Sequence, residues 1–355
     1  MDATTVAIDL AKDVFEVAVA NRTGRIVARQ RLRRRPFERF LEELAPGTEV
    51  VMEACGTAHY WGRRCQARDL PVRLLPTQYV RPYVRRNKTD RTDTEALLEA
   101  ARCGGVPPVG IKSAEQQTLQ GLHRVRAQWQ MTRTARINLV RALLREQGLP
   151  IPLGARTLLA RVASLLEDAE TTLSDRLRST VALLVEEIHA LEGRLATIDA
   201  QLAEVARTDP IAIRLQQIPG VGVLTATAMV AAVPHIHAFR RSRAFASWLG
   251  LTPRESSSGR RRYLGGISKR GDVYLRCLLA HGARSVLWTS RRRIQAGRIP
   301  PTPFQHWAVT LAARRGQNKA VIGVANKLAR MIWAVWHHDV DFRQPLRGAD
   351  AACIV

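Results

Sequence analysis

Four acidic residues in the N-terminal part of the chain are candidates for a metal-binding or catalytic site. Asp9 lies inside an apolar strand pattern, and Glu53 closes the apolar run 50–52. A charge in such a place is unfavourable unless a cation compensates it. Asp90 and Asp93 are three residues apart at the start of a predicted helix, so they share one helical face and can converge on one ion.

Each acid also has a simple structural explanation when it is taken singly. Asp9 and Glu53 fit turn positions at strand ends, and Asp90 and Asp93 fit the first turn of a helix. Together, in a strongly basic chain, four carboxylates form the ligand set with which two Mg²⁺ ions bind a phosphodiester. Because crowded carboxylates repel one another, we expect this site to be stable only with metal bound.

A second group of candidate residues lies between positions 252 and 271. Three consecutive serines, Ser256 to Ser258, precede Gly259 there. The same segment carries the cations Arg254, Arg260, Arg261, Arg262, Lys269 and Arg270. Guanidinium groups suit phosphate and base edges, so we expect this segment to hold a nucleic-acid strand. A run of serines before glycine is also typical of a flexible polar turn, which is the alternative to a catalytic role.

The whole chain carries an excess of positive charge. Its 355 residues include 55 Lys and Arg against 31 Asp and Glu, which gives a formal net charge of +24. A genome that favours arginine codons explains the choice of arginine over lysine, but not the excess of positive over negative charge. The composition therefore predicts a polyanionic partner, and nucleic acid is the leading candidate.

Several classes of protein are excluded by composition. Five cysteines without a C-x-x-C pair indicate neither a zinc ribbon nor a disulfide framework. The start of the chain lacks the features of a signal peptide, and the longest apolar run, 221–233, is shorter than the ~18 residues of a membrane span. We expect a cytoplasmic protein with no membrane partner.

An α/β domain over residues 1–105 must position the four acids. Alternating apolar residues between 4 and 32 predict a three-stranded meander with a turn at 21–24. Further patterns predict strands at 49–53 and 72–75 and helices at 36–44, 59–69 and 90–103. Hairpin strands followed by alternating strands and helices give a mixed sheet, and the breaker-rich segment 104–108 ends the domain.

Long helices are predicted for the middle segment, residues 106–210. One helix begins at Ser113, with Gln116 completing a capping box, and ends near Gly148. Apolar residues between 173 and 205 follow a heptad repeat, which predicts a coiled coil. Periodicity does not name the partner helix: the seam fits the helix at 113–147 of the same chain and a helix of another chain equally well.

The C-terminal segment, residues 211–340, is predicted to be mainly helical, with a loose tail at 341–355. The sequence from Ile218 to Gly222 is typical of a helix-hairpin-helix, in which Gly220 and Gly222 expose backbone N–H groups to phosphate. A tight turn between packed helices is the alternative. Further predicted elements are helices at 241–249, 272–288 and 318–336 and a loop at 252–271.

Two sets of motifs resemble those of a known family. AID at 7–9, MEACG at 52–56 and NKTDRTDT at 87–94 resemble the acidic motifs of a RuvC-like (ribonuclease H-like) DEDD domain. The segments 218–222, 250–253, 258–259 and 266–271 resemble the second domain of the insertion-sequence transposases of the one-ten family. The motifs occur in the family's order, and the resemblance covers about residues 4–340.

The resemblance implies a DNA recombinase in which four acids bind Mg²⁺ and a serine attacks DNA to form a phosphoserine intermediate. By position, the acids named above match the metal ligands, and Ser258 matches the serine, with Ser256 and Ser257 beside it. Cys55 stands where many relatives have threonine. The implied partners are donor and target DNA and a structured noncoding bridge RNA that acts as the guide. The resemblance also implies a homo-oligomer, dimer or tetramer, in a bacterial cytoplasm and associated with the nucleoid when active.

Two other functions remain open at this point. A hydrolytic nuclease, such as a Holliday-junction resolvase, needs the acids but no serine, and the heptads and the second domain argue against it. A non-catalytic nucleic-acid-binding protein, such as an RNA scaffold, would leave the buried acids unexplained.

Overall fold

The computed structural model describes residues 3–84, 89–168, 170–171, 173–297 and 302–343. These residues form two compact units, one of Met1–Gln117 with Val233–His235 and one of Thr118–Ala232 with Ile236–Val355. Most of the predicted middle segment therefore groups with the C-terminal helices. The motif residues 87–88 and the predicted tail beyond residue 343 lie outside the described residues.

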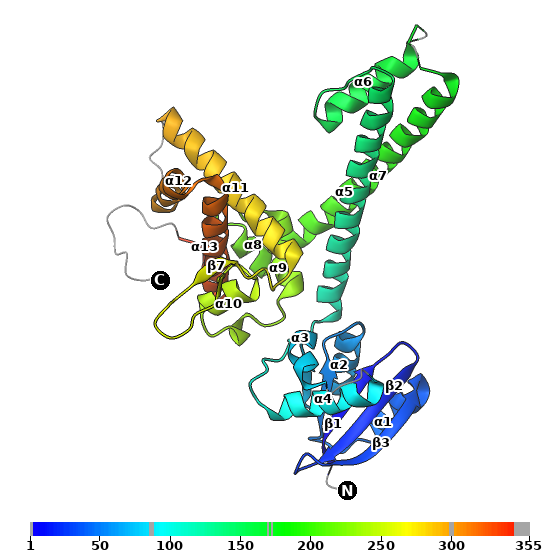
Figure 1. Ribbon diagram of the computed structural model, residues 1–355, viewed down its shortest axis with the longest axis vertical. Helices are drawn as coiled ribbons and strands as arrows, with labels where there is room; N and C mark the ends of the chain where they lie inside the picture. The colour runs from blue at the N-terminus through cyan, green and yellow to red at the C-terminus, as the bar shows by residue number, and fades with distance from the viewer. Residues whose placement is uncertain (1–2, 85–88, 169, 172, 298–301, 344–355) are drawn as a thin grey trace. The chain divides into compact units, whose positions relative to one another are not determined.

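A mixed five-stranded sheet forms the centre of the first unit (Figure 1). Its strands are β1 (Ala3–Leu10), β2 (Val14–Asn21), β3 (Ile26–Arg33), β4 (Glu49–Glu53) and β5 (Val72–Leu75). The order across the sheet is β3-β2-β1-β4-β5, with an antiparallel meander of the first three strands and with β4 and β5 parallel to β1. The predicted meander and both later strands are confirmed.

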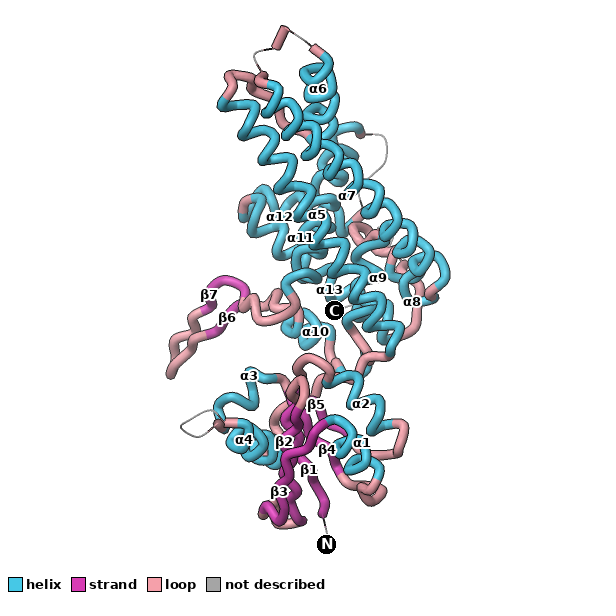
Figure 2. Tube along the Cα trace, turned by 90° about the vertical axis from the view of Figure 1, so that its right-hand side faces the viewer, coloured by secondary structure: helices cyan, strands magenta, loops and turns pink. Residues whose placement is uncertain are grey.

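Helices cover both faces of this sheet (Figure 2). One face packs against α1 (Arg34–Glu42) and α2 (Ala58–Gln66), where the stacked rings of Phe15 and Phe37 meet the edge of Trp61 at centroid distances of 5.3 and 4.9 Å. The other face packs against α4 (Asp90–Arg102). Two short turns, α3 (Thr77–Val80) and η1 (Arg81–Tyr83), follow β5.

The second unit is mostly helical. Its elements are α5 (Ala114–Glu146), whose first turn belongs to the first unit, α6 (Ala155–Glu167), α7 (Asp175–Thr208), α8 (Pro210–Leu215), α9 (Val223–Ala232), η2 (Ile236–Ala238), α10 (Ser242–Trp248), β6 (Pro253–Glu255), β7 (Leu264–Ile267), α11 (Val273–Ala296), α12 (Pro303–Arg315) and α13 (Gln317–His337). Sequence patterns missed α6 and α12 and predicted a loop where β6 and β7 form a hairpin. No described helix is both long and apolar enough to cross a lipid bilayer.

Most of the heptad seam of α7 packs within the same chain. Three ion pairs join α5 to α7: Arg126–Asp199, Arg133–Glu192 and Arg136–Glu187. As the number on α5 rises, the number on α7 falls, so the two helices run antiparallel. Apolar seam residues of α7 lie in a core shared with α5 and α6. Of the two partners that the heptads allow, the structure therefore shows the helix of the same chain.

The turn between α8 and α9 packs directly against α11. Gly220 has φ +89°, a left-handed value that favours glycine. A Cβ on Gly282 of α11 would lie 2.1 Å from the Gly220 carbonyl oxygen, so neither position has room for a side chain. Gly220 thus fits the structural alternative, a tight turn between packed helices, whereas Gly222 is exposed with open space around it.

This close approach predicts that Gly282→Ala destabilises the second unit. The added methyl group would force the two backbones apart, at a cost of about 1–3 kcal/mol in the free energy of unfolding. Gly193→Ala in α7 is the matched control, because nothing lies within 4 Å of its Cβ position. There, alanine should stabilise the helix by up to about 1 kcal/mol. Chemical denaturation measures both, and equal effects would contradict the packing.

One buried histidine ties three helices together. His123 of α5 lies 3.1 Å from the Tyr274 hydroxyl of α11 through Nδ1 and 3.0 Å from the Thr227 hydroxyl of α9 through Nε2. Because the Thr227 hydroxyl donates to the Val223 carbonyl, it must accept from Nε2–H, which leaves Nδ1 to accept from Tyr274. Burial, with Arg126 nearby, lowers the pKa of His123 to about 4, so the ring is neutral.

A histidine buried in the neutral form should make stability depend on pH. The unfolded chain binds a proton at His123 near pH 6.5 and the folded chain only near pH 4, so stability falls as the pH falls through this window. At pH 5 this amounts to about 2 kcal/mol. We expect the difference in unfolding free energy between wild type and His123→Asn to narrow by that amount from pH 7 to pH 5, as measured by urea denaturation. An unchanged difference would contradict the neutral ring.

Candidate active site

Two of the predicted acids lie side by side at the carboxyl ends of parallel strands. The register pairs Ile8 with Met52, so the next residues along β1 and β4 are Asp9 and Glu53. Neighbouring strands are about 4.8 Å apart. Side chains alternate along a strand, so both acids share the face of Ala7, which packs under α4. Both are half-buried.

The pKa of the Cys55 thiol is affected by both carboxylates. The thiol lies in the turn after β4, half-buried, and donates to the Gly56 carbonyl. Burial raises the pKa of Cys55, and the charges of Glu53 and then Asp9 raise it further. Both acids thus raise the pKa of one thiol, as expected when the acids are neighbours. The same turn contains Thr57 with φ +68°, an uncommon value for a residue other than glycine.

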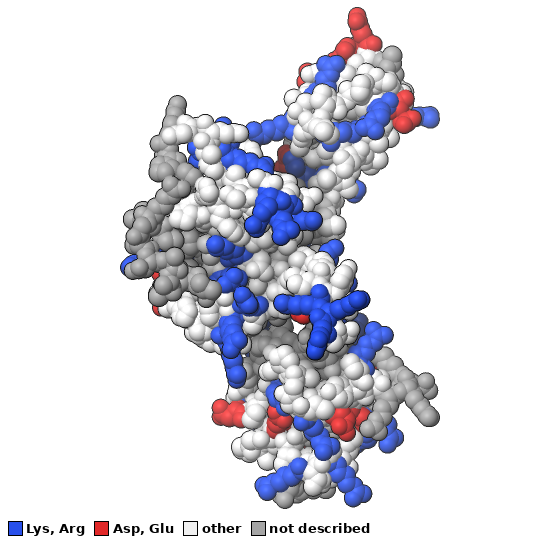
Figure 3. All heavy atoms as spheres, turned by 60° about the vertical axis from the view of Figure 1, so that its left-hand side comes forward, with Lys and Arg blue, Asp and Glu red and all other residues white. Residues whose placement is uncertain are grey.

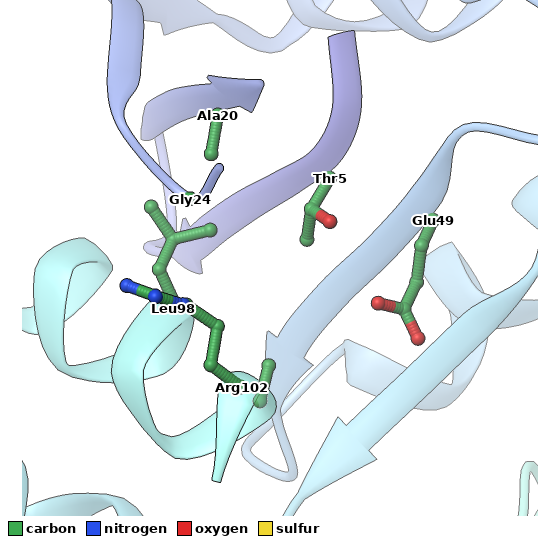
Figure 4. Close-up of a pocket in the computed structure, with 7 residues that line it drawn as sticks. Thr5, Ala20, Gly24, Glu49, Leu98 and Arg102 are labelled. Carbon is green, nitrogen blue, oxygen red and sulfur yellow. The ribbon is translucent and has the colours of Figure 1, made fainter. Parts of the chain in front are cut away.

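The direction of α4 brings its first turn toward these acids. Figure 4 shows a small pocket where Leu98 and Arg102 of α4 meet Thr5 and Glu49, which lie near the starts of β1 and β4. One helical turn and two strand residues each advance about 6 Å. Asp93 lies more than one turn before Leu98, so it is nearer than Leu98 to the carboxyl ends of β1 and β4, where Asp9 and Glu53 lie. A capping box between Thr89 and Thr92 fixes the start of the helix at Asp90.

Asp90 is turned toward β3. Its carboxylate lies 3.8 Å from Nη2 of Arg31, and both side chains are exposed. The register aligns Arg31 with Glu16 and Glu16 with Asp9 across neighbouring strands. Glu53 continues this row on β4, so one cation and three carboxylates cross the sheet on the face that α4 covers.

Glu16 is a site residue that the sequence patterns did not single out. It is half-buried and lies directly between Asp9 and Arg31 in the row. The signal that could have found it is the hairpin register. Counting outward from the connection between β1 and β2, residues 11–13, places Glu16 opposite Asp9, on the strand face that also holds Ala18.

The strand acids fit a hard divalent cation. Asp9 and Glu53 supply the carboxylate oxygens that Mg²⁺ prefers, from neighbouring positions of two paired strands. Across the described part of the chain, no three His, Cys, Asp or Glu side chains are close enough together to hold one ion. Convergence of all four acids, with Asp90 and Asp93 joining the strand acids, stays a prediction.

The serine run lies on a protruding β-hairpin of the second unit (Figure 2). Glu255 pairs with Leu264, the Ser256 N–H donates to the Tyr263 carbonyl, and Ser258 and Arg261 exchange two backbone hydrogen bonds of 3.2 and 3.1 Å. A two-residue turn follows, in which Gly259 has φ +53°. Every residue from 253 to 266 is exposed.

The hairpin has two chemically different faces. On one face, Glu255 accepts from the Ser257 hydroxyl at 2.9 Å and from Nε of Arg262 at 3.0 Å. These two contacts, first Arg262 and then Ser257, lower the pKa of Glu255. Because side chains alternate, Ser258 and Arg261 project from the opposite face. The structure thus separates Ser258 from Ser257, and it separates Arg261 from the internally paired Arg262.

Lys269 and Arg270 lie on a segment held close to the backbone of α10. The Lys269 N–H donates to the Gly250 carbonyl. A Cβ on Gly271 would lie 2.2 Å from the carbonyl oxygen of Trp248, so only glycine fits there. Lys269 itself has φ +57°, and its side chain and that of Arg270 are exposed. This packing presents both cations to solvent.

Positive side chains also spread over the rest of the surface. Figure 3 shows Lys and Arg distributed over the face in view, with fewer Asp and Glu among them. The exposed side of α11 adds Arg284, Arg291, Arg292 and Arg293. The exposed arginines of these elements are therefore available to a polyanion.

A RuvC-like, ribonuclease H-like sheet with acids at its strand ends, joined to an arginine-rich helical unit, defines a class of DNA-processing enzymes. Residues 6–148 match the DEDD transposase family, and residues 212–297 match the family described as "Transposase IS116/IS110/IS902 family".

Relatives along nearly the whole chain agree with these matches. The chain is 39% identical to a "Probable family 20 transposase" of Pseudomonas aeruginosa, over 97% of this chain and 99% of the relative. It is 36% identical to the "Transposase for insertion sequence element IS1111A" of Coxiella burnetii, over 96% and 92%. It is 34% identical to the transposase of IS1328 from Yersinia enterocolitica, over 94% and 96%. The chain belongs to the IS110 family of insertion-sequence transposases.

The two faces of the hairpin predict unequal roles for neighbouring arginines. Arg261→Ala should weaken DNA binding and lower the slope of log affinity against log salt by about one, because one phosphate contact is lost. Arg262→Ala should change both quantities less, because Glu255 already neutralises that guanidinium. Fluorescence anisotropy over a salt series measures both. Equal losses in the two variants would contradict the assignment of faces.

Proposed function

We propose that this transposase cuts and rejoins DNA through two sites, one in each unit. Asp9, Glu53, Asp90 and Asp93 hold Mg²⁺, two ions in all, and Ser258 is the nucleophile. The observation that carries the proposal is the arrangement of the serines on the hairpin. Ser257 is bound to Glu255, whereas Ser256 and Ser258 project from the opposite face, and Ser258 is the one directly across from Arg261.

In the proposed reaction, the hydroxyl oxygen of Ser258 attacks the phosphorus of a phosphodiester. A bond forms between the Ser258 oxygen and the phosphorus as a P–O bond of the DNA breaks. The serine loses a proton in this step, and the leaving DNA oxygen gains one to become a hydroxyl. Bound Mg²⁺ would offset negative charge on the phosphate and help the serine lose its proton. Arg261 and Arg254 neutralise the phosphates beside the cut. A hydroxyl of a second strand then attacks the same phosphorus and releases Ser258, without ATP.

A structured noncoding RNA is the proposed guide. Its support is the family to which the chain belongs and the charge of +24, which exceeds what a single DNA contact in the hairpin needs. Because base pairing with the RNA would read the target, the chain would need few contacts to base edges.

Covalent attachment of DNA tests the serine step. Wild-type protein incubated with guide RNA, substrate and Mg²⁺ should retain DNA on a denaturing gel. Ser258→Ala should retain none, because it lacks the attacking oxygen, whereas Ser257→Ala should still form the adduct. Asp93→Ala should form no adduct while binding nucleic acid nearly normally, because one carboxylate is a small part of the total charge. Cleavage to free ends without any adduct would favour a hydrolytic nuclease.

Subunits are proposed to share the active site, with acids of one chain facing the serine of another. Since most of the α7 seam packs within its own chain, this assembly would use other surfaces. A mixture of Asp9→Ala and Ser258→Ala proteins should regain cleavage that neither has alone. In a mixed pair of subunits, one shared site combines the intact acids of one chain with the intact Ser258 of the other. Native mass spectrometry provides the control that mixed oligomers formed. Mixed oligomers without cleavage would place the acids and serine of one site in the same chain.

A further inference from the structure

Tyr263 is a large aromatic side chain left in water on the hairpin. Tyr263 is 69% exposed, so its ring does not pack against the rest of the hairpin to any large extent. It pairs with Ser256, and Ser258 pairs with Arg261, so Tyr263 is the diagonal neighbour of Ser258 on one face. Diagonal side chains on a hairpin start about 7–8 Å apart.

The face that carries Tyr263 is suited to a nucleic-acid strand. Alternation places Arg254 and Arg261 on it with Ser256 and Ser258, and it places the carboxylate of Glu255 on the other face, where Arg262 and Ser257 hold it. The Tyr263 face thus combines two cations, two serine hydroxyls and an aromatic ring, with no acid of the hairpin among them. A surface that binds a single strand combines cations, which contact the phosphate backbone, with aromatic rings, which stack on the bases.

We propose that Tyr263 is a nucleobase-binding site: its ring stacks on the base of a nucleotide next to the phosphate that Ser258 attacks. This inference rests on the proposed function of Ser258. The stacked base fixes the strand so that the neighbouring phosphate lies between Arg261 and the Ser258 hydroxyl. Stacking accepts every base, so Tyr263 contributes position and affinity, and it leaves the reading of sequence to other parts of the complex.

The test uses the full chain with guide RNA and a DNA substrate that carries 2-aminopurine at each position around the cut in turn. Stacking quenches 2-aminopurine fluorescence, so wild type should quench the probe at a position flanking the cut. Tyr263→Phe should keep the quenching, because the ring remains. Tyr263→Ala should lose it and should bind the substrate about tenfold more weakly. Leu264→Ala is the matched control, because Leu264 is also exposed but lies on the other face.

The outcomes separate this inference from the serine step. Quenching that persists in Tyr263→Ala, with thermal unfolding unchanged, would overturn the base site even if DNA still attaches to Ser258. Quenching that depends on Tyr263 in a wild-type protein that forms no DNA adduct would uphold the base site and reject the serine step. Equal losses in Tyr263→Ala and Leu264→Ala would also overturn the base site, because the effect would then come from the hairpin as a whole.

Discussion

Backbone hydrogen bonding holds two carboxylates next to each other, and the first unit is arranged around that constraint. Asp9 and Glu53 are neighbours because β1 and β4 pair in parallel and end together. Two like charges at this distance repel, so the surrounding structure must be stable enough to keep them there. The aromatic contacts of Phe15, Phe37 and Trp61 stabilise one side of the sheet. On the other side, alanines under α4 let the helix come close.

In the second unit, the β6–β7 hairpin gives different environments to residues of the same type. Three serines and three arginines occupy seven consecutive positions, and composition alone cannot rank them. The strand period divides them into two sets, and Glu255 binds one set internally. Ser256, Ser258 and Arg261 lie on the face without a hairpin acid, and of the two serines Ser258 is the one directly across from Arg261. A short exposed hairpin of this kind carries little packing, so its order depends on the backbone pairs and on the contacts of Glu255.

Much of the first unit follows from the sequence, because period-two alternation directly reports a sheet with covered faces. The same method found α5 and α7 but not what α7 packs against, since heptads encode an apolar seam without naming its partner. It missed the β6–β7 hairpin, whose residues are nearly all exposed and therefore show no burial pattern. Glu16 was missed because its role depends on cross-strand register. Gly220 was predicted to contact phosphate, and its packing on Gly282 arises from a long-range approach that no local pattern encodes.

The proposed metal binding by the strand acids can be measured without the DNA reaction. Electron paramagnetic resonance of Mn²⁺ added to the full chain should show saturable binding, and Mg²⁺ should compete for it and raise the unfolding temperature. Glu53→Gln should abolish the binding, whereas Glu43→Gln, an exposed acid away from the strand ends, should leave it unchanged. Equal binding by wild type and Glu53→Gln would show that the strand acids do not hold the metal.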